Sequence, residues 1–331
     1  MNNFEWANAS SIESAVKLLQ PVDPQGDPDE MARPIGGGQD LLTSMKEYLV
    51  RPPRVVNLKT IAGLDQIKPD GKGGLRIGAT VTITDLYENA DVQAKFPGLA
   101  EAATSIASPQ IRNVGTVGGN LCQRPRCWYF RLESVQCIKK GGPVCYAAGG
   151  QNKYNAIFNT GPSKIVHPSD LAPMLIALGA TVTIFGTEGA RTIPMDTFFT
   201  TPNQDVRKEN ILKDGEIVTE VQVPATTARS TYLKFKERES YDFALSAVAA
   251  VVEFALDKTV RNARLVLGGV ASIPWHVPAA EKSLIGKTIT EDNAAAAATL
   301  ALANAKPLEF NAYKVPLTET LIRRALLKLN A

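Results

Sequence analysis

The chain has 331 residues, 44% of them hydrophobic and 21% charged, with 25 glycines and 21 prolines spread along its length. This length suits two domains, and the composition is typical of a loop-rich globular protein, which excludes a disordered or coiled-coil chain. The formal net charge of +3 is small for this size, so charge gives no reason to expect a nucleic-acid partner.

The N-terminal residues show no basic segment followed by an apolar one, which is the pattern of a signal peptide. The longest uncharged stretch, residues 171–185, is short and is interrupted by Pro173 and Gly179. A membrane-spanning helix needs about 20 apolar residues. We therefore expect neither a signal peptide nor a membrane span.

Mixed secondary structure is predicted for the first half of the chain. Ser10 and Glu13 form a capping-box pattern, and apolar residues at helical spacing then predict an amphipathic helix up to Leu19. Runs rich in β-branched residues at 55–58 and 75–79 are bounded by proline or glycine and predict short strands. The class expected is mixed α and β.

The second half continues this pattern and then changes near residues 225–230, where we place a domain boundary. Before that boundary we expect a strand from Lys164, a helix from Ser169 to Leu178, and strands at 181–185 and 217–223. Beyond it, two apolar runs predict neighbouring strands and three helical patterns close the chain. These elements are expected at residues 247–256, 263–270, 277–285, 292–305 and 318–329.

Two glycine-rich turns are candidate anion sites. The first contains Gly36, Gly37 and Gly38, followed by Gln39 and Asp40. The second runs through residues 112–120 and contains Gly115, Gly118 and Gly119. Consecutive glycines allow backbone N–H groups to converge on a phosphate oxygen, although a plain tight turn is the alternative for either one. Because the GxGxxG and Walker A motifs are absent in the required context, the common nucleotide-binding folds are not expected.

All four cysteines of the chain lie within 24 residues, at positions 122, 127, 137 and 145. The spacing contains no CxxC pair, which favours an iron–sulfur cluster over structural zinc. Five basic residues in the same segment would offset the negative charge of such a cluster: Arg124, Arg126, Arg131, Lys139 and Lys140. Disulfides or free surface thiols remain the alternatives.

Five segments together resemble one family. They are GGGQDLL at 36–42, IGATVTITDL at 77–86, SPQIRNVGTVGGNL at 108–121, HPSDLAPMLIALGA at 167–180 and YLKFKERESYDFALSAVAAVV at 232–252. In this order they resemble the FAD-binding medium subunit of the molybdenum hydroxylases, a family that includes the flavoprotein chains of carbon monoxide dehydrogenase, xanthine dehydrogenase and bacterial aldehyde oxidoreductases. The resemblance covers essentially the whole chain.

The resemblance implies an α+β fold with two domains. Residues 1–226 would form a PCMH-type FAD-binding domain with two α/β subdomains, about 1–58 and 59–226, and an inserted loop at 122–150. Residues 229–331 would form a smaller α+β domain, the C-terminal domain of the carbon monoxide dehydrogenase flavoproteins, with a three-stranded sheet and helices.

The cysteine segment is similar to a subset of the family in which an inserted loop holds a [4Fe-4S] cluster. The phrases CWYF at 127–130 and LGGVASIPW at 267–275 resemble the periplasmic aldehyde oxidoreductase members most closely. The resemblance implies that Cys127, Cys137 and Cys145 are cluster ligands, with Cys122 as the fourth because no other cysteine exists.

The resemblance also implies an FAD site. Residues 36–40 and 116–120 match the segments that wrap the diphosphate and ribityl chain, while Ile106 and Lys234 match positions near the isoalloxazine ring. Asp170 matches an acid in the ribityl–ring region, and Thr80 is a further candidate. The implied FAD contacts are Gly36, Gly37, Gly38, Gln39, Asp40, Thr80, Ile106, Thr116, Gly118, Gly119, Asn120, Asp170 and Lys234. Gln39 departs from the threonine that is common in this family.

As implied function, the chain would transfer electrons within a larger oxidoreductase and carry no substrate site of its own. Substrate would be oxidised at a molybdenum cofactor on a large subunit, and electrons would pass through two [2Fe-2S] centres on a small subunit to this FAD and then to an external acceptor. The complex would be a heterotrimer or its dimer, located in the cytoplasm, or in the periplasm by co-export with a partner that bears a signal.

Two alternatives from other classes are a stand-alone FAD-dependent oxidase or reductase and a zinc-stabilised nucleic-acid-binding module. Lys234 near the ring would raise the flavin potential, with a surface salt bridge as the alternative reading. His167 and His276 are expected to be structural. Trp128, Tyr129 and Phe130 would either shield the cluster or pack the loop.

Overall fold

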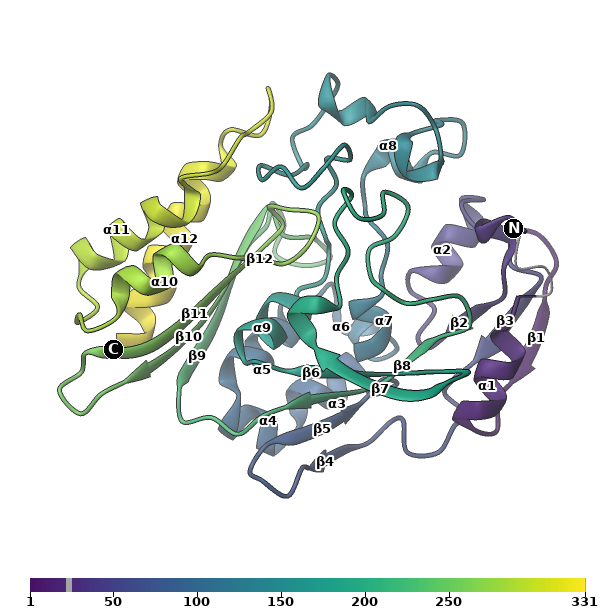
Figure 1. The fold of residues 1–331 in the computed structure, drawn as a ribbon, viewed down its shortest axis with the longest axis horizontal. Helices are drawn as coiled ribbons and strands as arrows, with labels where there is room; N and C mark the ends of the chain where they lie inside the picture. Colours follow the sequence, from purple (N-terminus) through teal and green to yellow (C-terminus); the bar gives the residue numbers. More distant parts are fainter. Residues whose placement is uncertain (22–25, 331) are drawn as a thin grey trace.

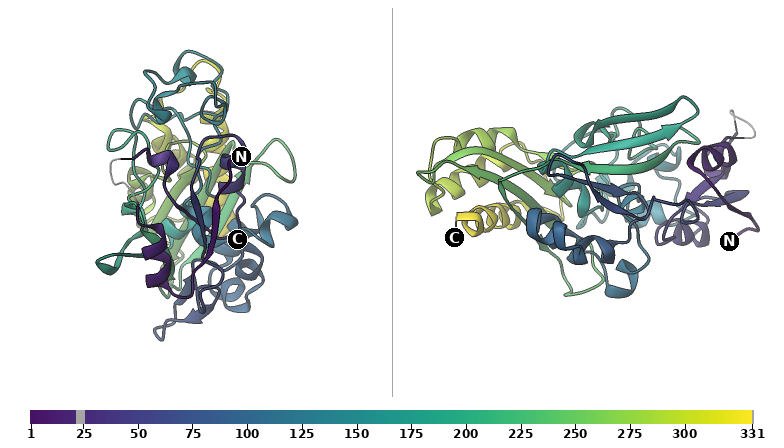
Figure 2. Two further views of the ribbon diagram at one scale, coloured as in Figure 1. Left: turned by 90° about the vertical axis from the view of Figure 1, so that its right-hand side faces the viewer. Right: turned by 90° about the horizontal axis from the view of Figure 1, so that it is seen from below.

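The computed structural model describes residues 1–21 and 26–330. Three sheets lie in a row from one end of the molecule to the other, each with its own helices (Figures 1 and 2). The N-terminal sheet stands at one end, the C-terminal sheet at the other, and a five-stranded sheet lies between and below them in the view of Figure 1. The predicted mixture of helices and strands is confirmed.

The N-terminal sheet is parallel, with the order β1-β3-β2. Its strands are β1 (Glu5–Asn8), β2 (Arg33–Ile35) and β3 (Arg54–Asn57), accompanied by α1 (Ile12–Leu19) and α2 (Leu41–Lys46). Pro34 is tolerated in β2 because β2 is an edge strand. The predicted cap of α1 at Ser10 is wrong by one residue, since the extended Ser11 accepts a hydrogen bond from the backbone of Ser14 at 3.1 Å.

The central sheet is antiparallel, with the order β4-β5-β8-β6-β7. Its strands are β4 (Ile67–Pro69), β5 (Leu75–Gly78), β6 (Thr181–Gly186), β7 (Gly189–Pro194) and β8 (Ile217–Val223). Short helices pack with it: α3 (Ile83–Glu88), α4 (Ala90–Lys95), α5 (Pro97–Thr104), α6 (Pro109–Arg112), α7 (Val117–Leu121) and α9 (Leu171–Ala177). The strands predicted at 181–185 and 217–223 are confirmed.

The C-terminal sheet has the order β12-β11-β10-β9. Its strands are β9 (Arg229–Phe235), β10 (Ser246–Phe254), β11 (Val260–Gly268) and the two-residue β12 (Trp275–His276), and its helices are α10 (Pro278–Leu284), α11 (Glu291–Leu302) and α12 (Lys314–Asn330). The sheet predicted with three strands therefore gains β12 as a short edge. The three closing helices and the pairing of the two apolar runs are confirmed.

Strand β10 is apolar on both sides because it lies between two cores. Ala247 and Ala249 pack into the core of the central part, while Val248 and Ala250 pack into the core under α10, α11 and α12. A strand that is covered on both faces reads as a continuous hydrophobic run, as this one does. The C-terminal sheet is thereby fixed against the central helices α5 and α9.

The segment that contains the four cysteines, residues 122–150, is called the cysteine loop below. It rises above the three sheets in Figure 1 and contains the short helix α8 (Trp128–Arg131) and two turns of 3₁₀ helix, Ile138–Lys140 and Tyr146–Ala148. The strand predicted from Lys164 is wrong. Residues 164–169 make only single backbone contacts, such as Ala156 N–H to the Lys164 carbonyl at 3.0 Å and His167 N–H to the Ala271 carbonyl at 2.9 Å, and no ladder forms.

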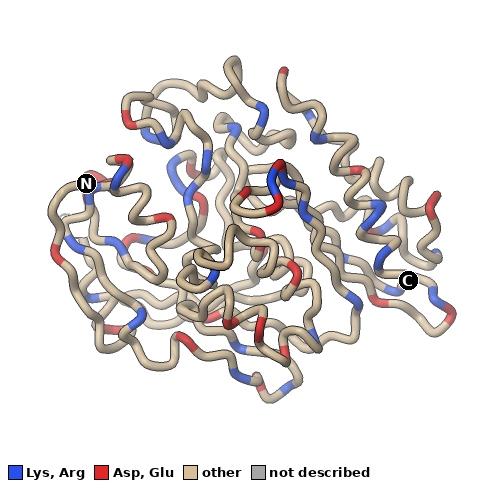
Figure 3. Tube along the Cα trace, turned by 180° about the vertical axis from the view of Figure 1, so that it is seen from behind, with Lys and Arg blue, Asp and Glu red and all other residues tan. Residues whose placement is uncertain are grey.

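Charged residues of both signs are interspersed along the trace in Figure 3. Within residues 1–21 and 26–330, no helix combines the length and the apolar character that crossing a bilayer requires.

Candidate functional site

The two glycine-rich turns lie against each other. A Cβ atom placed on Gly36 would come within 2.6 Å of the Thr116 hydroxyl, and one on Gly37 within 1.9 Å of the Val114 carbonyl oxygen. Gly38 has a φ of +71°, in the left-handed region. Only glycine therefore allows the first turn to approach the second this closely.

The first turn is a candidate anion nest. It follows the carboxyl end of the parallel strand β2, the usual position of ligands in parallel sheets, and leads into α2. None of the backbone N–H groups of Gly37, Gly38 and Gln39 has an acceptor among the residues that the structure describes. These donors are available for a phosphate.

The second turn has a different role from the one expected. The N–H groups of Gly115, Val117, Gly118 and Asn120 donate to the carbonyls of Ile111, Val81, Ala79 and Thr116, at 2.7 to 3.0 Å. That of Gly119 donates to the Thr116 hydroxyl at 3.2 Å. The prediction that this turn supplies a second nest of free donors is therefore wrong for these five N–H groups, because they already stabilise the turn itself. It contributes a closely packed wall.

A cavity of about 700 Å³ runs along these turns. Among the residues predicted to contact FAD, ten line it: Gly36, Gly37, Gly38, Gln39, Asp40, Ile106, Thr116, Gly119, Asn120 and Asp170. The opposite wall comes from residues 205–216 and 238–243. Segments that are far apart in the sequence thus enclose one site, of a size that suits a large cofactor.

Three predicted residues do not line this cavity. Gly118 packs against Ala79 beneath the second turn, since a Cβ there would lie 3.0 Å from Ala79. Thr80 is buried, and its hydroxyl has no partner within the described chain. Lys234 reaches the site only through Asp170.

Asp170 is the centre of a buried polar cluster at the cavity wall. Lys234 Nζ lies 2.8 Å from one carboxylate oxygen, and the Tyr232 hydroxyl donates to the other at 2.8 Å. The Lys234 side chain is 3% exposed, which rules out a surface salt bridge. Its Nζ also donates to the Ser105 carbonyl at 3.1 Å. Burial and the Asp170 carboxylate raise the pKa of Tyr232 well above its usual value, so this hydroxyl stays a donor.

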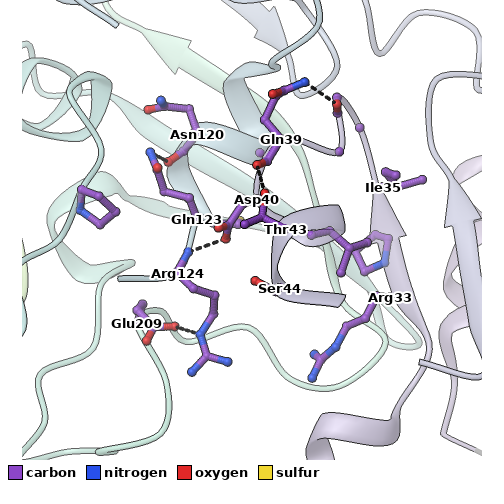
Figure 4. A pocket seen from close by; sticks show the side chains of 18 of the residues that line it. Arg33, Ile35, Gln39, Asp40, Thr43, Ser44, Asn120, Gln123, Arg124 and Glu209 are labelled. Carbon is purple, nitrogen blue, oxygen red and sulfur yellow. Dashed lines mark hydrogen bonds and ion pairs between the residues drawn. The ribbon is translucent and has the colours of Figure 1, made fainter. Parts of the chain in front are cut away.

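Sequence reasoning missed several cavity residues. Arg33 begins β2, which leads into the first turn, and Figure 4 shows its guanidinium and that of Arg124 extending toward the same end of the pocket. Burial and the nearby Arg124 lower the pKa of Arg33. Tyr241, Asp242 and Phe243 line the cavity from the segment before β10. The sequence could have indicated these three residues, since they belong to ERESYDF at 237–243, within one of the segments that resemble the family.

The basic residues of the cysteine loop are committed to carboxylates. Asp40 accepts from Arg126 Nη1 and Arg131 Nη2, each at 2.7 Å, and Glu209 lies 2.7 Å from Arg124 Nε and 2.6 Å from Lys139 Nζ. Four of the five basic side chains that were expected to offset the charge of a cluster therefore have carboxylate partners of their own. They attach the loop to the cavity walls.

The four cysteines fall into two neighbourhoods. Cys127 and Cys137 share a small apolar cluster with Phe130, and the Cys145 thiol acts with burial to raise the pKa of Cys127. Val144 forms a β-bridge with Cys137, so the backbone of the next residue, Cys145, lies close to Cys137. Cys122 instead ends α7, lines the cavity and packs against the central core. Burial raises its pKa to about 12.

The described residues do not assemble the expected four-thiolate site. No three side chains of Cys, His, Asp or Glu within the described ranges converge on one metal position. Of the loop aromatics, Phe130 packs in the apolar cluster, Trp128 is 45% exposed, and the Tyr129 hydroxyl accepts from Gln151 N–H at 2.8 Å.

The two histidines make structural contacts. His167 Nδ1 accepts from Ser169 N–H at 3.3 Å, and burial lowers the pKa of His167 to about 4, so the ring is neutral. His276 Nε2 lies 2.7 Å from a Glu281 carboxylate oxygen. Neither side chain lines the large cavity. His167 lines a second cavity of about 240 Å³, together with Cys127 and Asp170.

Comparison with protein families gives two matches. Residues 2–226 match the FAD binding domain in molybdopterin dehydrogenase, and residues 230–329 match the CO dehydrogenase flavoprotein C-terminal domain. Together they cover almost the whole chain.

Individual relatives agree with these matches. The chain is 34% identical over 304 residues to the aldehyde oxidoreductase FAD-binding subunit PaoB of Escherichia coli, covering 91% of this chain and 92% of the relative. It is 29% identical to the carbon monoxide dehydrogenase medium chain of Hydrogenophaga pseudoflava, over 98% of this chain and 96% of that one. Among solved structures, a carbon monoxide dehydrogenase from H. pseudoflava matches with a TM-score of 0.77 and 29% identity, over 99% of this chain and 97% of that one.

Proposed function

Because the chain belongs to the family of FAD-binding medium subunits of the molybdenum hydroxylases, we propose that it is the electron-transfer subunit of such an oxidoreductase. Electrons would reach its FAD from partner subunits that hold the molybdenum cofactor and [2Fe-2S] centres, and would leave to an external acceptor. The observation that carries this proposal is the cavity itself, which joins a nest of free backbone donors to the buried Asp170–Lys234 pair.

The residues of the cavity suit an FAD that lies along it. The N–H groups of Gly37, Gly38 and Gln39 would bind the diphosphate, and Arg33 adds positive charge to the same wall. Ile106 supplies an apolar surface for the ring. FAD, when bound, exchanges electrons in pairs or one at a time.

The Asp170–Lys234 pair would set the charge beside the isoalloxazine ring. The sequence suggested a lone cation there, which would favour added negative charge on the flavin. In the structure the positive charge of Lys234 is balanced by Asp170 at 2.8 Å, and Tyr232 further stabilises the carboxylate. Beside a bound flavin, the pair would therefore present an oriented dipole rather than a net charge, and its effect on the flavin potential would be smaller than that of an unpaired lysine.

We further propose that the cysteine loop holds a [4Fe-4S] cluster, which would pass single electrons. Cys127, Cys137 and Cys145 support this, since they lie in one neighbourhood of the loop. Cys127 also lines the second cavity together with Asp170, so the loop would lie close to the flavin ring if Asp170 contacts the ring region. Cys122 lies apart from these three, because it lines the large cavity and packs against the central core.

Serine replacement tests the ligand set. After anaerobic reconstitution with iron and sulfide, we expect Cys127→Ser, Cys137→Ser and Cys145→Ser to lose most of the bound iron and Cys122→Ser to keep it. Wild-type protein that retains neither iron nor sulfide would show that the loop holds no cluster.

FAD titration of the purified full-length chain tests the main proposal. Quenching of flavin fluorescence should report stoichiometric binding, and pull-down should recover chains with molybdenum-cofactor and [2Fe-2S] domains. Reduction of the bound flavin by an organic substrate without any partner would instead indicate a stand-alone oxidase. Failure to bind FAD at micromolar concentrations would contradict both functions.

For location we propose the cytoplasm, or the periplasm by co-export with a partner that bears a signal. Cell fractionation followed by detection of the chain separates the two compartments.

A further inference from the structure

Asp40 stands where the FAD nest and the cysteine loop meet. It follows Gln39 directly and precedes α2, so its backbone belongs to the first glycine turn. Its carboxylate, by contrast, binds the cysteine loop. One oxygen accepts from Arg126 and Arg131 at 2.7 Å each, and the other accepts from the backbone N–H of Arg124 at 2.7 Å.

In these contacts a largely buried carboxylate pairs with two guanidinium groups. The side chain of Arg131 is 10% exposed and that of Asp40 is 17% exposed. Burial alone would raise the pKa of Asp40, but Arg126 and Arg131 outweigh it and hold that pKa below its ordinary value. Removing Asp40 would leave Arg126 without its ion-pair partner and Arg131 with only Glu47 at 3.4 Å, so the geometry is strongly preferred.

The loop folds around this carboxylate. Arg131 also donates to the carbonyls of Pro125 and Arg124, at 2.8 and 3.2 Å, and to the Ser44 hydroxyl on α2 at 2.9 Å. The backbone at the start of the loop is thus bound by Arg131 through its carbonyls and by Asp40 through the N–H of Arg124.

A second anchor lies on the opposite wall of the cavity. Glu209 pairs with Arg124 and Lys139, and Lys139 Nζ also donates to the carbonyls of Val206 and Lys208, at 3.0 and 3.2 Å. Figure 4 shows Arg124 between the two anchors, with Asp40 on one side and Glu209 on the other. The loop therefore spans the two walls between which FAD would lie. Of the two anchors, only Asp40 belongs to the nest.

We infer that Asp40 is a positioning residue that couples FAD binding at the first glycine turn to the order of the cysteine loop. FAD holds the turn in the conformation that presents the carboxylate to the loop, and the ordered loop holds the turn in the conformation that binds FAD. Such a coupling is reciprocal, so each state stabilises the other. The inference rests on the proposed FAD site and assigns its Asp40 side chain to the loop instead of to the cofactor.

Thiol reactivity in the full-length, cluster-free chain measures the coupling. Cys137 and Cys145 lie within the loop and line neither cavity, whereas Cys122, the first residue of the loop, lines the FAD cavity. Alkylation of each thiol by iodoacetamide, followed by peptide mass spectrometry, is compared with and without saturating FAD. Slower alkylation of Cys122 reports occupancy of the site itself, and slower alkylation of Cys137 and Cys145 reports order in the loop.

In wild-type protein we expect FAD to slow alkylation of Cys137 and Cys145 at least about fivefold, the lower end of typical couplings. In Asp40→Asn, saturating FAD should still slow the alkylation of Cys122. It should change the alkylation rates of Cys137 and Cys145 less than about twofold. The matched control is Glu133→Gln, which removes an exposed loop carboxylate paired with Arg51. This control should behave as wild type.

Three results would overturn the inference while the proposed function stands: FAD protects Cys122 alone in wild type, Asp40→Asn keeps full protection of the loop thiols, or Glu133→Gln loses it as well. Absence of any FAD binding by wild type contradicts the proposed function instead. If Asp40→Asn does not fold, Arg126→Gln removes one of the two side-chain donors and leaves Arg131 in place. In Arg126→Gln, FAD should then slow the alkylation of Cys137 and Cys145 less than it does in wild type. Equal slowing in the two proteins overturns the inference.

Discussion

At the scale of single residues, a sequence motif shows where a side chain is but not what balances it. Lys234 and Asp170 were both identified from phrases that resemble a family, yet nothing in those phrases shows that the two form an ion pair 2.8 Å apart with Tyr232 as a third member. The partners are 64 residues apart in the chain. The same holds for Asp40, whose three partners come from the cysteine loop.

Lys234→Met should destabilise the fold, because it leaves the Asp170 carboxylate buried with only Tyr232 as its partner. Breaking a buried ion pair from one side typically costs about 3–5 kcal/mol in the free energy of unfolding. Urea denaturation measures this loss. Lys328→Met is the control, since Lys328 and Glu101 form a pair whose side chains are 48% and 35% exposed, and such partly exposed pairs are worth at most about 1 kcal/mol. Equal losses in the two variants would contradict the role given to Asp170.

His167 predicts a pH dependence of stability. Its pKa is about 4 in the folded chain because burial disfavours the charged ring, with Lys139 adding to this effect and Glu209 partly opposing it. The unfolded chain, with a pKa near 6.5, binds the proton more readily between these values. Stability should therefore fall as pH decreases from about 6.5 to about 4, by up to about 3 kcal/mol from this group. Urea denaturation across this range should show a flatter profile for His167→Gln, and parallel profiles would refute the assignment.

At the scale of elements, sequence periodicity predicted the strands and helices whose burial pattern is set by their own residues. The strands at 181–185 and 217–223 and the three closing helices were confirmed because their burial follows from their own sequence. The strand predicted from Lys164 was wrong, since no neighbouring strand offers it a ladder. The second glycine turn was misassigned for a similar reason. Its composition resembles that of the first turn, and only the three-dimensional structure shows that its amides are already bonded.

Gly37→Ala tests the contact between the two turns. Its Cβ would overlap the Val114 carbonyl oxygen at 1.9 Å, so the turns must separate, which typically costs about 1–3 kcal/mol of stability. FAD affinity, measured by fluorescence quenching, should fall at least about tenfold, since a misplaced nest loses about one hydrogen bond to a charged group. Gly149→Ala is the matched control, because a Cβ there has no atom within 4 Å. Unchanged FAD affinity in Gly37→Ala would contradict the assignment of the nest.

At the scale of the whole molecule, the site lies between parts that the sequence keeps apart. The cavity takes its walls from the N-terminal sheet, the second turn, residues 205–216 and the segment before β10. Family resemblance located most of the first two walls, whereas Arg33 and the third wall emerged only from the fold. The C-terminal part is also tied to the exit of the cysteine loop. Residues 306–314 make hydrogen bonds to residues 152–157 through backbone and side chains.

Asn311 is the centre of this tie and provides the test of it. It is fully buried, its amide donates to the carbonyls of Asn155 and Ala156 at 3.1 and 3.2 Å, and its oxygen accepts from Leu308 N–H at 2.6 Å. Asn311→Ala leaves the two carbonyls and the Leu308 N–H without these hydrogen-bond partners, at a cost of about 1–3 kcal/mol for each unsatisfied group. We expect a loss of roughly 3 kcal/mol in the free energy of unfolding.

The same variant should also open the loop selectively, because residues 152–157 follow the cysteine loop directly and lose their anchor. Limited proteolysis of Asn311→Ala should cut within residues 122–157 faster than in wild type, before any cut in the sheets. Asn293→Ala is the control, since Asn293 donates to Thr288 in a more exposed setting on α11. If Asn311→Ala lowers stability but leaves the order of cleavage unchanged, the C-terminal part stabilises the molecule without holding the cysteine loop in place.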